Sequence, residues 1–204
     1  MRSIRFMPIF LIVFAVTYYF VDTSPVTEAG TCRPTMNDVE GPYYLTGSPF
    51  RDKIADPDEQ GERIIVSGTV RKSDCQTPVR NALIEVWQTD AKGKYYYSED
   101  EFRLRGQLKA DEKGRYRFST IRPGRYRIMS GFRPAHIHLK ISHPDFMTVT
   151  TQLYFKGDSY LWPNDACGPG CKSNDPLRII ALDEKKGELQ GTFDIILIPL
   201  STSK

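Results

Sequence analysis

The sequence has little that would suit a nucleic-acid partner or a repeat architecture. Its 204 residues carry a formal net charge of only +3, and residues of both signs are interspersed along the chain. A nucleic-acid surface needs cationic residues gathered in one patch, so we expect no nucleic-acid partner. Internal repeats and low-complexity tracts are absent, and no stretch shows a convincing helical period. These absences leave an ordinary globular chain with little helix.

No apolar run reaches the roughly 20 residues that a membrane-spanning helix needs. The run from Phe6 to Val21 is too short and contains Pro8. It follows two arginines and precedes small and polar residues, which is typical of a secretory signal peptide. We therefore predict a signal peptide over residues 1–30, cleaved after Ala29 or Gly30, and a secreted, extracellular product with no membrane attachment. The alternative is an uncleaved membrane anchor.

Cysteine is scarce but even in number, with Cys32, Cys75, Cys167 and Cys171. An even number in a secreted chain favours disulfides, although four cysteines permit three connectivities. We expect Cys167–Cys171, because the glycines between them can close a small loop, and Cys32–Cys75. A zinc site is the alternative, but Cys-x3-Cys with two distant cysteines is a poor ligand set in an oxidising compartment. Asn-x-Ser/Thr is absent, so no N-linked glycan is expected.

Cleavage would leave about 175 residues, enough for one domain with a core. Residues 31–62 contain four prolines and read as an extended N-terminal segment. From residue 63 onward, short β-branched stretches alternate with turns rich in Gly, Pro and Asp. The expected strands cover residues 63–70, 81–88, 104–108, 115–120, 125–129, 133–141, 150–155 and 191–198. Short strands at regular spacing predict an all-β sandwich or barrel over residues 63–204.

Histidine is rarer still, and two of the three histidines, His136 and His138, stand together in the stretch from Arg133 to Ile141. The apolar residues of that stretch take the opposite parity, as in a strand with one buried face. Side chains two residues apart on a strand project from the same face at about 6.5 Å. Two imidazoles at that separation can bind one metal ion, although the polar face of a sheet would explain them too. His143 falls at an expected turn, and we interpret it as a surface residue.

Two imidazoles leave a metal ion short of ligands, and the chain has 11 tyrosines that could supply oxygen. Tyr95 follows the turn at residues 90–94, and Tyr126 follows Pro123-Gly124 just before the histidines. The phenol pKa is about 10, but a trivalent cation can hold the group as tyrosinate. Two tyrosinates and two imidazoles would suit ferric iron. Position alone does not distinguish these tyrosines from others that serve in packing.

Three motifs follow one another in an order that is more specific than any of them alone. They are Trp-x7-Tyr ending at Tyr95, Pro-Gly-x-Tyr ending at Tyr126, and Arg-Pro-Ala-His-x-His ending at His138. With Leu104-Arg105-Gly106 and the stretch 152–158, they resemble the intradiol ring-cleavage dioxygenases, the non-haem ferric family of catechol and protocatechuate dioxygenases. The resemblance covers roughly residues 38–160. It implies a β-sandwich of the prealbumin-like, intradiol dioxygenase type, with long loops and little helix.

The resemblance also implies a metal centre with one Fe(III) per chain, whose protein ligands would be Tyr95, Tyr126, His136 and His138. A catechol would bind through both oxygens and release Tyr126, and the displaced ligands would accept its two protons. Arg133 matches a residue that stabilises negative charge on the substrate ring, and Gln152 matches one near the dioxygen-derived group. The expected reaction cleaves catechols between the two hydroxylated carbons with both atoms of O2, giving cis,cis-muconate-type products. Candidate pocket walls are Asp38, Tyr43, Tyr96 and Met129.

Bacterial-type members of that family carry a helical N-terminal region for dimerisation. The roughly thirty residues available here are too short and too rich in proline for one, so we expect a monomer or at most a weak dimer. The strand motifs alone also resemble prealbumin-like sandwiches that need no metal, and a non-catalytic binding module is the main alternative. A secreted zinc hydrolase is a second alternative, but no HExxH-like element is present. The histidine pair, with Arg133 and Tyr95, favours the dioxygenase.

Overall fold

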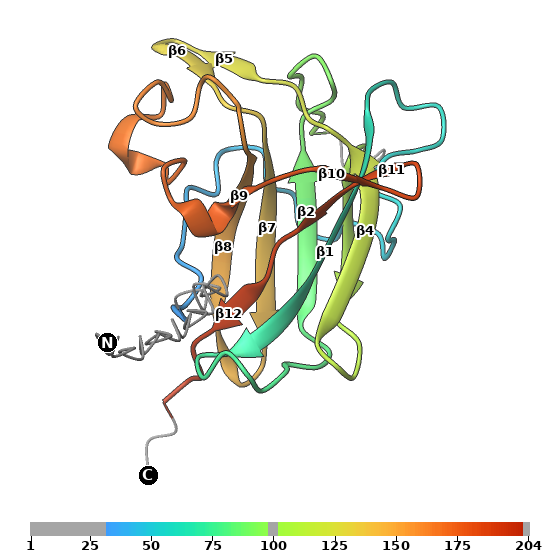
Figure 1. Ribbon diagram of the computed structural model, residues 1–204, viewed down its shortest axis with the longest axis vertical. Helices are drawn as coiled ribbons and strands as arrows, with labels where there is room; N and C mark the ends of the chain where they lie inside the picture. Colours follow the sequence, from blue (N-terminus) through green and yellow to red (C-terminus); the bar gives the residue numbers. More distant parts are fainter. Residues whose placement is uncertain (1–31, 98–101, 202–204) are drawn as a thin grey trace, which may run out of the picture. The chain divides into compact units, whose positions relative to one another are not determined.

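Short strands make up nearly all of the regular structure in residues 32–97 and 102–201, the part of the chain that the computed structural model describes (Figure 1). The only helical elements there are two short 3-10 helices, η1 (Gly168–Gly170) and η2 (Pro176–Arg178). The all-β prediction is therefore confirmed. The predicted signal peptide, residues 1–30, lies outside the described residues. No helix in the described ranges is long and apolar enough to cross a membrane.

The first sheet is organised around one long strand. Its members are β1 (Arg63–Lys72), β4 (Arg115–Ile121), β10 (Asp183–Lys185), β11 (Glu188–Thr192) and β12 (Ile195–Leu197). β4 pairs antiparallel with β1, whereas β11 and then β12 pair parallel with it. β11 and β12 keep one register along β1, and between them the Phe193 carbonyl oxygen would lie 1.9 Å from a Cβ at Gly68. Glycine at 68 thus lets the C-terminal segment follow β1 along its length.

The second sheet carries the histidines. It has the order β3 (Arg105–Lys109), β2 (Leu83–Gln88), β7 (His136–His143), β8 (Phe146–Phe155) and β9 (Ile179–Ile180). The first four strands pair antiparallel, and β9 joins β8 in parallel. A separate hairpin, β5 (Tyr126–Ile128) with β6 (Gly131–Arg133), stands beyond the end of the sandwich (Figure 1). Neither five-stranded sheet closes on itself, so the fold is a sandwich and not a barrel.

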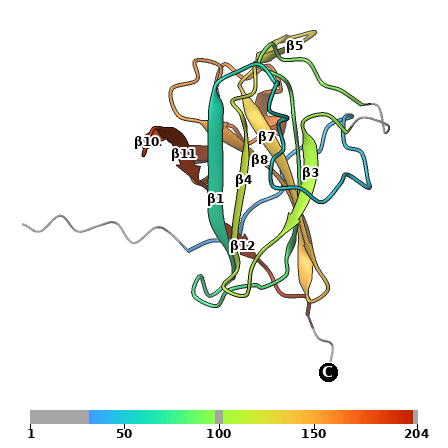
Figure 2. The same cartoon turned by 90° about the vertical axis from the view of Figure 1, so that its right-hand side faces the viewer.

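The core lies between the two sheets, which appear as two layers in Figure 2. It is lined by the inward residues of both, among them Val66 and Phe118 from the first sheet and Val86 and Leu139 from the second. Burying one such side chain stabilises the fold by about 1.5–3 kcal/mol. Because a strand turned the other way would expose all of its apolar side chains, the alternating pattern determines which face of the strand points into the core. The other face of β7 then carries His136 and His138, and it is buried as well.

The strand predictions need three corrections. The expected strand over residues 133–141 is two strands, because Pro134 lacks a backbone donor and separates β6 from β7. The expected strand over residues 191–198 is also two strands, since β11 ends at Thr192 and β12 begins at Ile195. The structure also has β9 and β10, which the sequence did not predict. Both are three residues long or shorter, and all three residues of β10 are exposed, so neither leaves an alternating signal.

Both expected disulfides are present. Cys32–Cys75 ties the N-terminal segment to the turn after β1, and Cys167–Cys171 closes a ring around η1. In the chain-entropy model, the stabilisation is about 4 kcal/mol for the longer loop and about 2 kcal/mol for the small ring. Residues 32–62 contain no named strand, but Ile54 enters the core and its backbone donates to Ser119 of β4 at 2.8 Å.

Candidate active site

His136 and His138 lie on the same face of β7, as the strand period predicts. Each is 2% exposed, and their ring centroids are 4.9 Å apart. The neighbouring strands place further polar side chains opposite them in register: Tyr154 pairs with His136, and Gln152 pairs with His138. On the other side, Trp87 of β2 pairs with His138, and the two rings stack at 4.7 Å. The sheet therefore fixes both imidazoles from three strands.

The two imidazoles are held in the form that binds metal ions. His136 Nδ1 donates to the Pro134 carbonyl oxygen at 2.7 Å, which leaves Nε2 with its lone pair toward the site. Burial, together with the nearby Arg133, lowers the pKa of His136 to about 3. Burial and the neighbouring His136 lower the pKa of His138 well below its ordinary value. Both rings are consequently neutral near pH 7.

Two glycines bring Tyr95 and Tyr126 together. The turn that precedes Tyr95 packs on the turn that precedes Tyr126, with Gly93 against Gly124. A Cβ at Gly124 would lie 2.4 Å from Gly93 N, so no larger residue fits there without a shift. Gly124 N also donates to the Asp90 carbonyl oxygen at 2.7 Å. The tyrosine rings meet edge to face at 5.3 Å.

The structure brings all four predicted ligand side chains into one place. The Tyr95 hydroxyl lies 3.0 Å from His138 Nε2 and 3.4 Å from His136 Nε2. Tyr126 reaches the same group from β5, with its ring 5.6 Å from that of His136. Tyr95 is buried and Tyr126 is half-buried. The donors that the site offers are therefore two imidazole nitrogens and two phenol oxygens.

This donor set fits a trivalent cation. Burial raises the pKa of the Tyr95 phenol well above its ordinary value, while the Arg133 and Arg105 guanidinium groups lower it. A phenol in that setting gives up its proton only where a strong positive charge stabilises the phenolate. In the described part of the chain, no group of three or more His, Cys, Asp or Glu side chains is arranged to hold a metal ion. The fit to iron rests on the tyrosines together with the neutral histidines.

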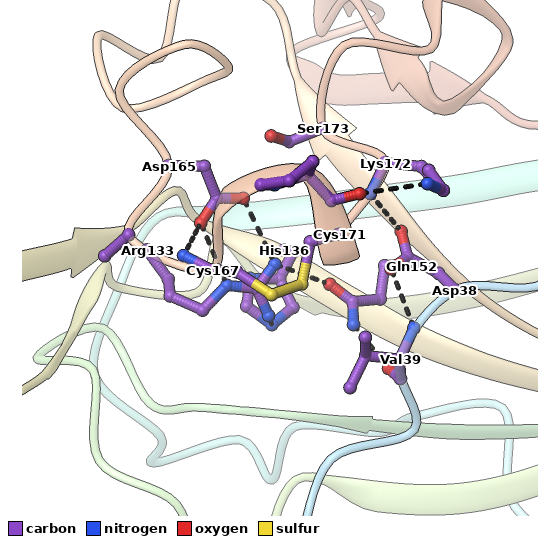
Figure 3. Close-up of a disulfide and its surroundings, with 12 residues drawn as sticks. Asp38, Val39, Arg133, His136, Gln152, Asp165, Cys167, Cys171, Lys172 and Ser173 are labelled. Carbon is purple, nitrogen blue, oxygen red and sulfur yellow. Dashed lines mark hydrogen bonds and ion pairs between the residues drawn. A yellow bond between two sulfur atoms is a disulfide. The ribbon is translucent and has the colours of Figure 1, made fainter. Parts of the chain in front are cut away.

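Arg133 and Gln152 lie beside His136, one of the four donors (Figure 3). Arg133 is the register partner of Tyr126 across the β5–β6 hairpin, and it is 3% exposed. Its Nη1 lies 3.5 Å from His136 Nε2, and its Nη2 donates to Gln152 Oε1 at 3.1 Å. Burial is the largest single influence and lowers the pKa of Arg133, but the Asp165 carboxylate together with Tyr154 and Tyr126 raises the pKa above its ordinary value. A permanent cation thus sits at the edge of the site.

Two buried carboxylates that were not among the predicted site residues hold Arg133 and the backbone beside it. Asp165 pairs with the Arg133 guanidinium, and its side chain is fully buried. Asp158 accepts from Ala135 N at 3.0 Å and from Arg125 Nε at 3.0 Å, so it ties the start of β7 to the segment that carries Tyr126. Asp158 is the last residue of the stretch 152–158 that carries part of the resemblance described above, so the sequence could have pointed to it. Asp165 stands in an irregular loop and gave no such signal.

The other residues named from the sequence fall in different places. Tyr43 stacks on Tyr95 at 4.3 Å and belongs to the site wall, whereas the Tyr96 hydroxyl turns to Asp90. Met129 is fully exposed, so the expectation that it lines the pocket was wrong. His143 ends β7 half-buried and accepts a hydrogen bond from Asp145 N, apart from the four donors.

Comparison with known proteins gives consistent matches. The family model described as "Dioxygenase" matches residues 39–197. Catechol 1,2-dioxygenase 2 of Acinetobacter lwoffii is 34% identical over 159 residues, which are 68% of this chain and 58% of that protein. Intradiol ring-cleavage dioxygenase prcA of Aspergillus niger is 32% identical over 67% of this chain and 50% of its own length. The chain thus spans only 58% and 50% of the length of these two relatives.

Solved structures agree with the sequence matches. The dioxygenase domain of a dioxygenase carbohydrate-binding protein fusion from Streptomyces sp. SirexAA-E aligns with a TM-score of 0.68 at 30% identity. That alignment covers 81% of this chain and 98% of the other. 3-Chlorocatechol 1,2-dioxygenase of Rhodococcus opacus 1CP aligns with a TM-score of 0.72 at 25% identity, covering 82% and 74% of the two chains.

Proposed function

The chain belongs to the intradiol ring-cleavage dioxygenase family, and from that membership we propose that it is a secreted non-haem Fe(III) enzyme that cleaves catechols with O2. The bond broken would join the two hydroxylated carbons, and both oxygen atoms would enter a cis,cis-muconate-type product. Catechol or chlorocatechol stands in the names of several relatives, which supports a catechol as the substrate class.

The observation that carries this proposal is the meeting of four donors beside one buried cation. Tyr95, Tyr126, His136 and His138 would hold one iron per chain. When bound, Fe(III) would draw electron density from a catecholate and make it reactive toward O2. The neutral Nε2 of His136 and the ring of His138, fixed against Trp87, give the preorganised geometry that such a centre requires.

The chain's own residues have three tasks in this reaction. The Tyr126 Oη would accept one of the two catechol protons, because a released phenolate is a strong base. The Arg133 guanidinium, held in a buried position, would stabilise negative charge that develops on the ring. The Gln152 side chain, hydrogen bonded to Arg133, would orient the oxygen that is being inserted.

The extracellular address and the monomeric state are part of the same proposal. Two disulfides fit an oxidising compartment, and free cysteines are absent from the described residues. A signal peptide over residues 1–30 would bring the chain there. An extended N-terminal segment at 31–62 and a catalytic domain at 63–204 would then form the mature monomer.

Oxygen labelling tests the proposed reaction. We expect the purified protein, given catechol under ¹⁸O₂, to release a dicarboxylic acid whose mass equals catechol plus both labelled atoms. A product that keeps an aldehyde would show cleavage outside the diol and contradict the intradiol reaction. A protein that binds catechol without consuming O2 would instead support a prealbumin-like binding module.

A further inference from the structure

The small disulfide ring stands next to the residues that border the candidate iron site. We call residues 165–172 the clasp: Asp165 precedes the ring Cys167–Cys171, and Lys172 follows it. Figure 3 draws the ring between two carboxylates, Asp165 and Asp38, each of which is hydrogen bonded to other residues of the group. The clasp is therefore linked to the site at both of its ends, directly through Asp165 and indirectly through Lys172.

At its first end the clasp fixes Arg133. Asp165 Oδ1 accepts from Arg133 Nε at 3.1 Å, and Oδ2 accepts from Nη2 at 3.2 Å. The two side chains are 4% and 0% exposed. A bidentate pair sets the plane of the guanidinium, and burial keeps water from competing for it. Asp165 thereby determines that Nη1 points to His136 and Nη2 to Gln152.

At its second end the clasp reaches Gln152 through two further groups. Lys172 N donates to Asp38 Oδ2 at 3.1 Å, and the Tyr154 hydroxyl lies 3.0 Å from the same oxygen. That hydroxyl is also 2.8 Å from Gln152 Oε1. The Asp38 side chain is fully buried and paired with Arg178. A continuous chain of polar contacts thus links the ring to the Gln152 amide.

The disulfide is the covalent constraint on the backbone between these two ends. The clasp contains no strand, and its ring includes Gly168 and Gly170, whose Cβ positions would face open space. A few hydrogen bonds, such as Ala166 N to the Phe132 carbonyl oxygen at 3.1 Å, dock it to the hairpin. Because the ring spans only 4 positions, against 43 for Cys32–Cys75, it restricts the unfolded chain far less. Its main effect is therefore on the local backbone of the folded protein.

We propose that the clasp is a positioning device for ring cleavage: Asp165 and the Cys167–Cys171 disulfide hold the Arg133 guanidinium, and through Asp38 and Tyr154 the Gln152 amide, in the orientation that the reaction needs. The inference rests on the proposed function. It assigns Asp165 as a positioning residue. It also makes turnover dependent on an oxidised ring, so that reduction of this disulfide slows the enzyme without unfolding it.

Two pairs of variants separate positioning from stability. Asp165→Asn removes the carboxylate charge, and Asp194→Asn is its control, since Asp194 pairs with Arg71 on the first sheet. Replacement of both Cys167 and Cys171 by Ser opens the ring, and the same change at Cys32 and Cys75 is its control. For all four proteins, kcat, KM, iron content and the melting temperature would be measured.

We expect Asp165→Asn and the opened ring to lower kcat by about tenfold or more, less than the loss of a whole charge-stabilising donor. KM should change by less than about threefold, because binding through the two catechol oxygens is retained. Asp165→Glu should recover part of kcat. Asp194→Asn should match the wild type, and loss of Cys32–Cys75 should lower the melting temperature but not kcat. Wild-type kcat in both test variants would overturn the proposal.

A second readout does not depend on turnover. In metal-free protein labelled with ¹⁵N-arginine, the Arg133 Nε–H should exchange slowly with solvent, and its signal is identified by its loss in Arg133→Lys. We expect exchange at least tenfold faster in Asp165→Asn and in the opened ring. Unchanged protection would refute the clasp even if the cysteine variant folds poorly. A wild-type protein that cleaves no catechol would refute the proposed function instead, while the exchange rates still decide whether the clasp holds Arg133.

Discussion

Adding a single methyl group at the contact between Gly93 and Gly124 should weaken iron binding strongly. In Gly124→Ala the new Cβ would lie 2.4 Å from Gly93 N and 2.5 Å from the Ala91 carbonyl oxygen, where ordinary contact begins at 3.4 Å. The two turns would have to move apart by about 1 Å, whereas metal–ligand distances tolerate about 0.2 Å. Tyr95 and Tyr126 would then no longer reach one ion without strain.

The size of the effect follows from what the movement breaks. The hydrogen bond from Gly124 N to the Asp90 carbonyl oxygen, 2.7 Å long, would be lost at a cost of about 1 kcal/mol. Overpacking costs about 1–3 kcal/mol more. Because the metal-free protein can relax by letting the turns separate, most of this 2–4 kcal/mol should appear as weaker iron binding, about 30- to 700-fold.

A chelator titration followed by the ferric-tyrosinate absorbance measures that loss. Gly47→Ala is the control: its Cβ would have no atom within 4 Å, although its φ of +79° adds a backbone penalty. We expect Gly47→Ala to lose about 1 kcal/mol of stability and to keep wild-type iron affinity. Wild-type iron affinity in Gly124→Ala would refute the view that the two glycines assemble the site.

Three further predictions concern other parts of the molecule. Tyr126→Phe should retain iron but slow catechol binding in stopped-flow traces, because one proton acceptor is lost; an unchanged rate would remove Tyr126 from the mechanism. Hydrogen bonds from the Thr77 side chain and from the backbone N–H groups of Thr77 and Gln76 lower the pKa of Asp74 from 3.8 to about 2. The stabilisation that the ionised carboxylate gives is therefore present above pH 3.8 and is lost as the pH falls toward 2. In Asp74→Asn, the free energy of unfolding in urea should depend less on pH across that window. An unchanged dependence on pH would contradict this. Removing Cys32–Cys75 should lower the free energy of unfolding in urea by about 4 kcal/mol, and no change would show that this loop does not restrict the unfolded chain.

The sequence predicted most of the fold because its strands carry strong local signals. In β7 the apolar residues alternate with the histidines, and that pattern set both the strand and the face on which the pair lies. Pro134 was present in the sequence, yet its effect, the break between β6 and β7, follows from backbone donors that no side-chain pattern shows. β10 was missed because three exposed residues have no face to bury.

The candidate site was predictable to the extent that its residues belong to ordered motifs. The tyrosines could not be selected by spacing, since what joins them is the contact between Gly93 and Gly124 from distant turns. Asp165 could not be identified from the sequence for a different reason. Its partner Arg133 lies 32 positions away, and only the docked loop brings the two together.

The visible spectrum of the purified protein, with metal content read on the same sample, is the decisive test for iron bound by Tyr95, Tyr126, His136 and His138. We expect a red ferric-tyrosinate colour at one iron per chain and a shift of that absorbance when catechol is added without oxygen. A colourless protein that cannot be reconstituted with iron would contradict it.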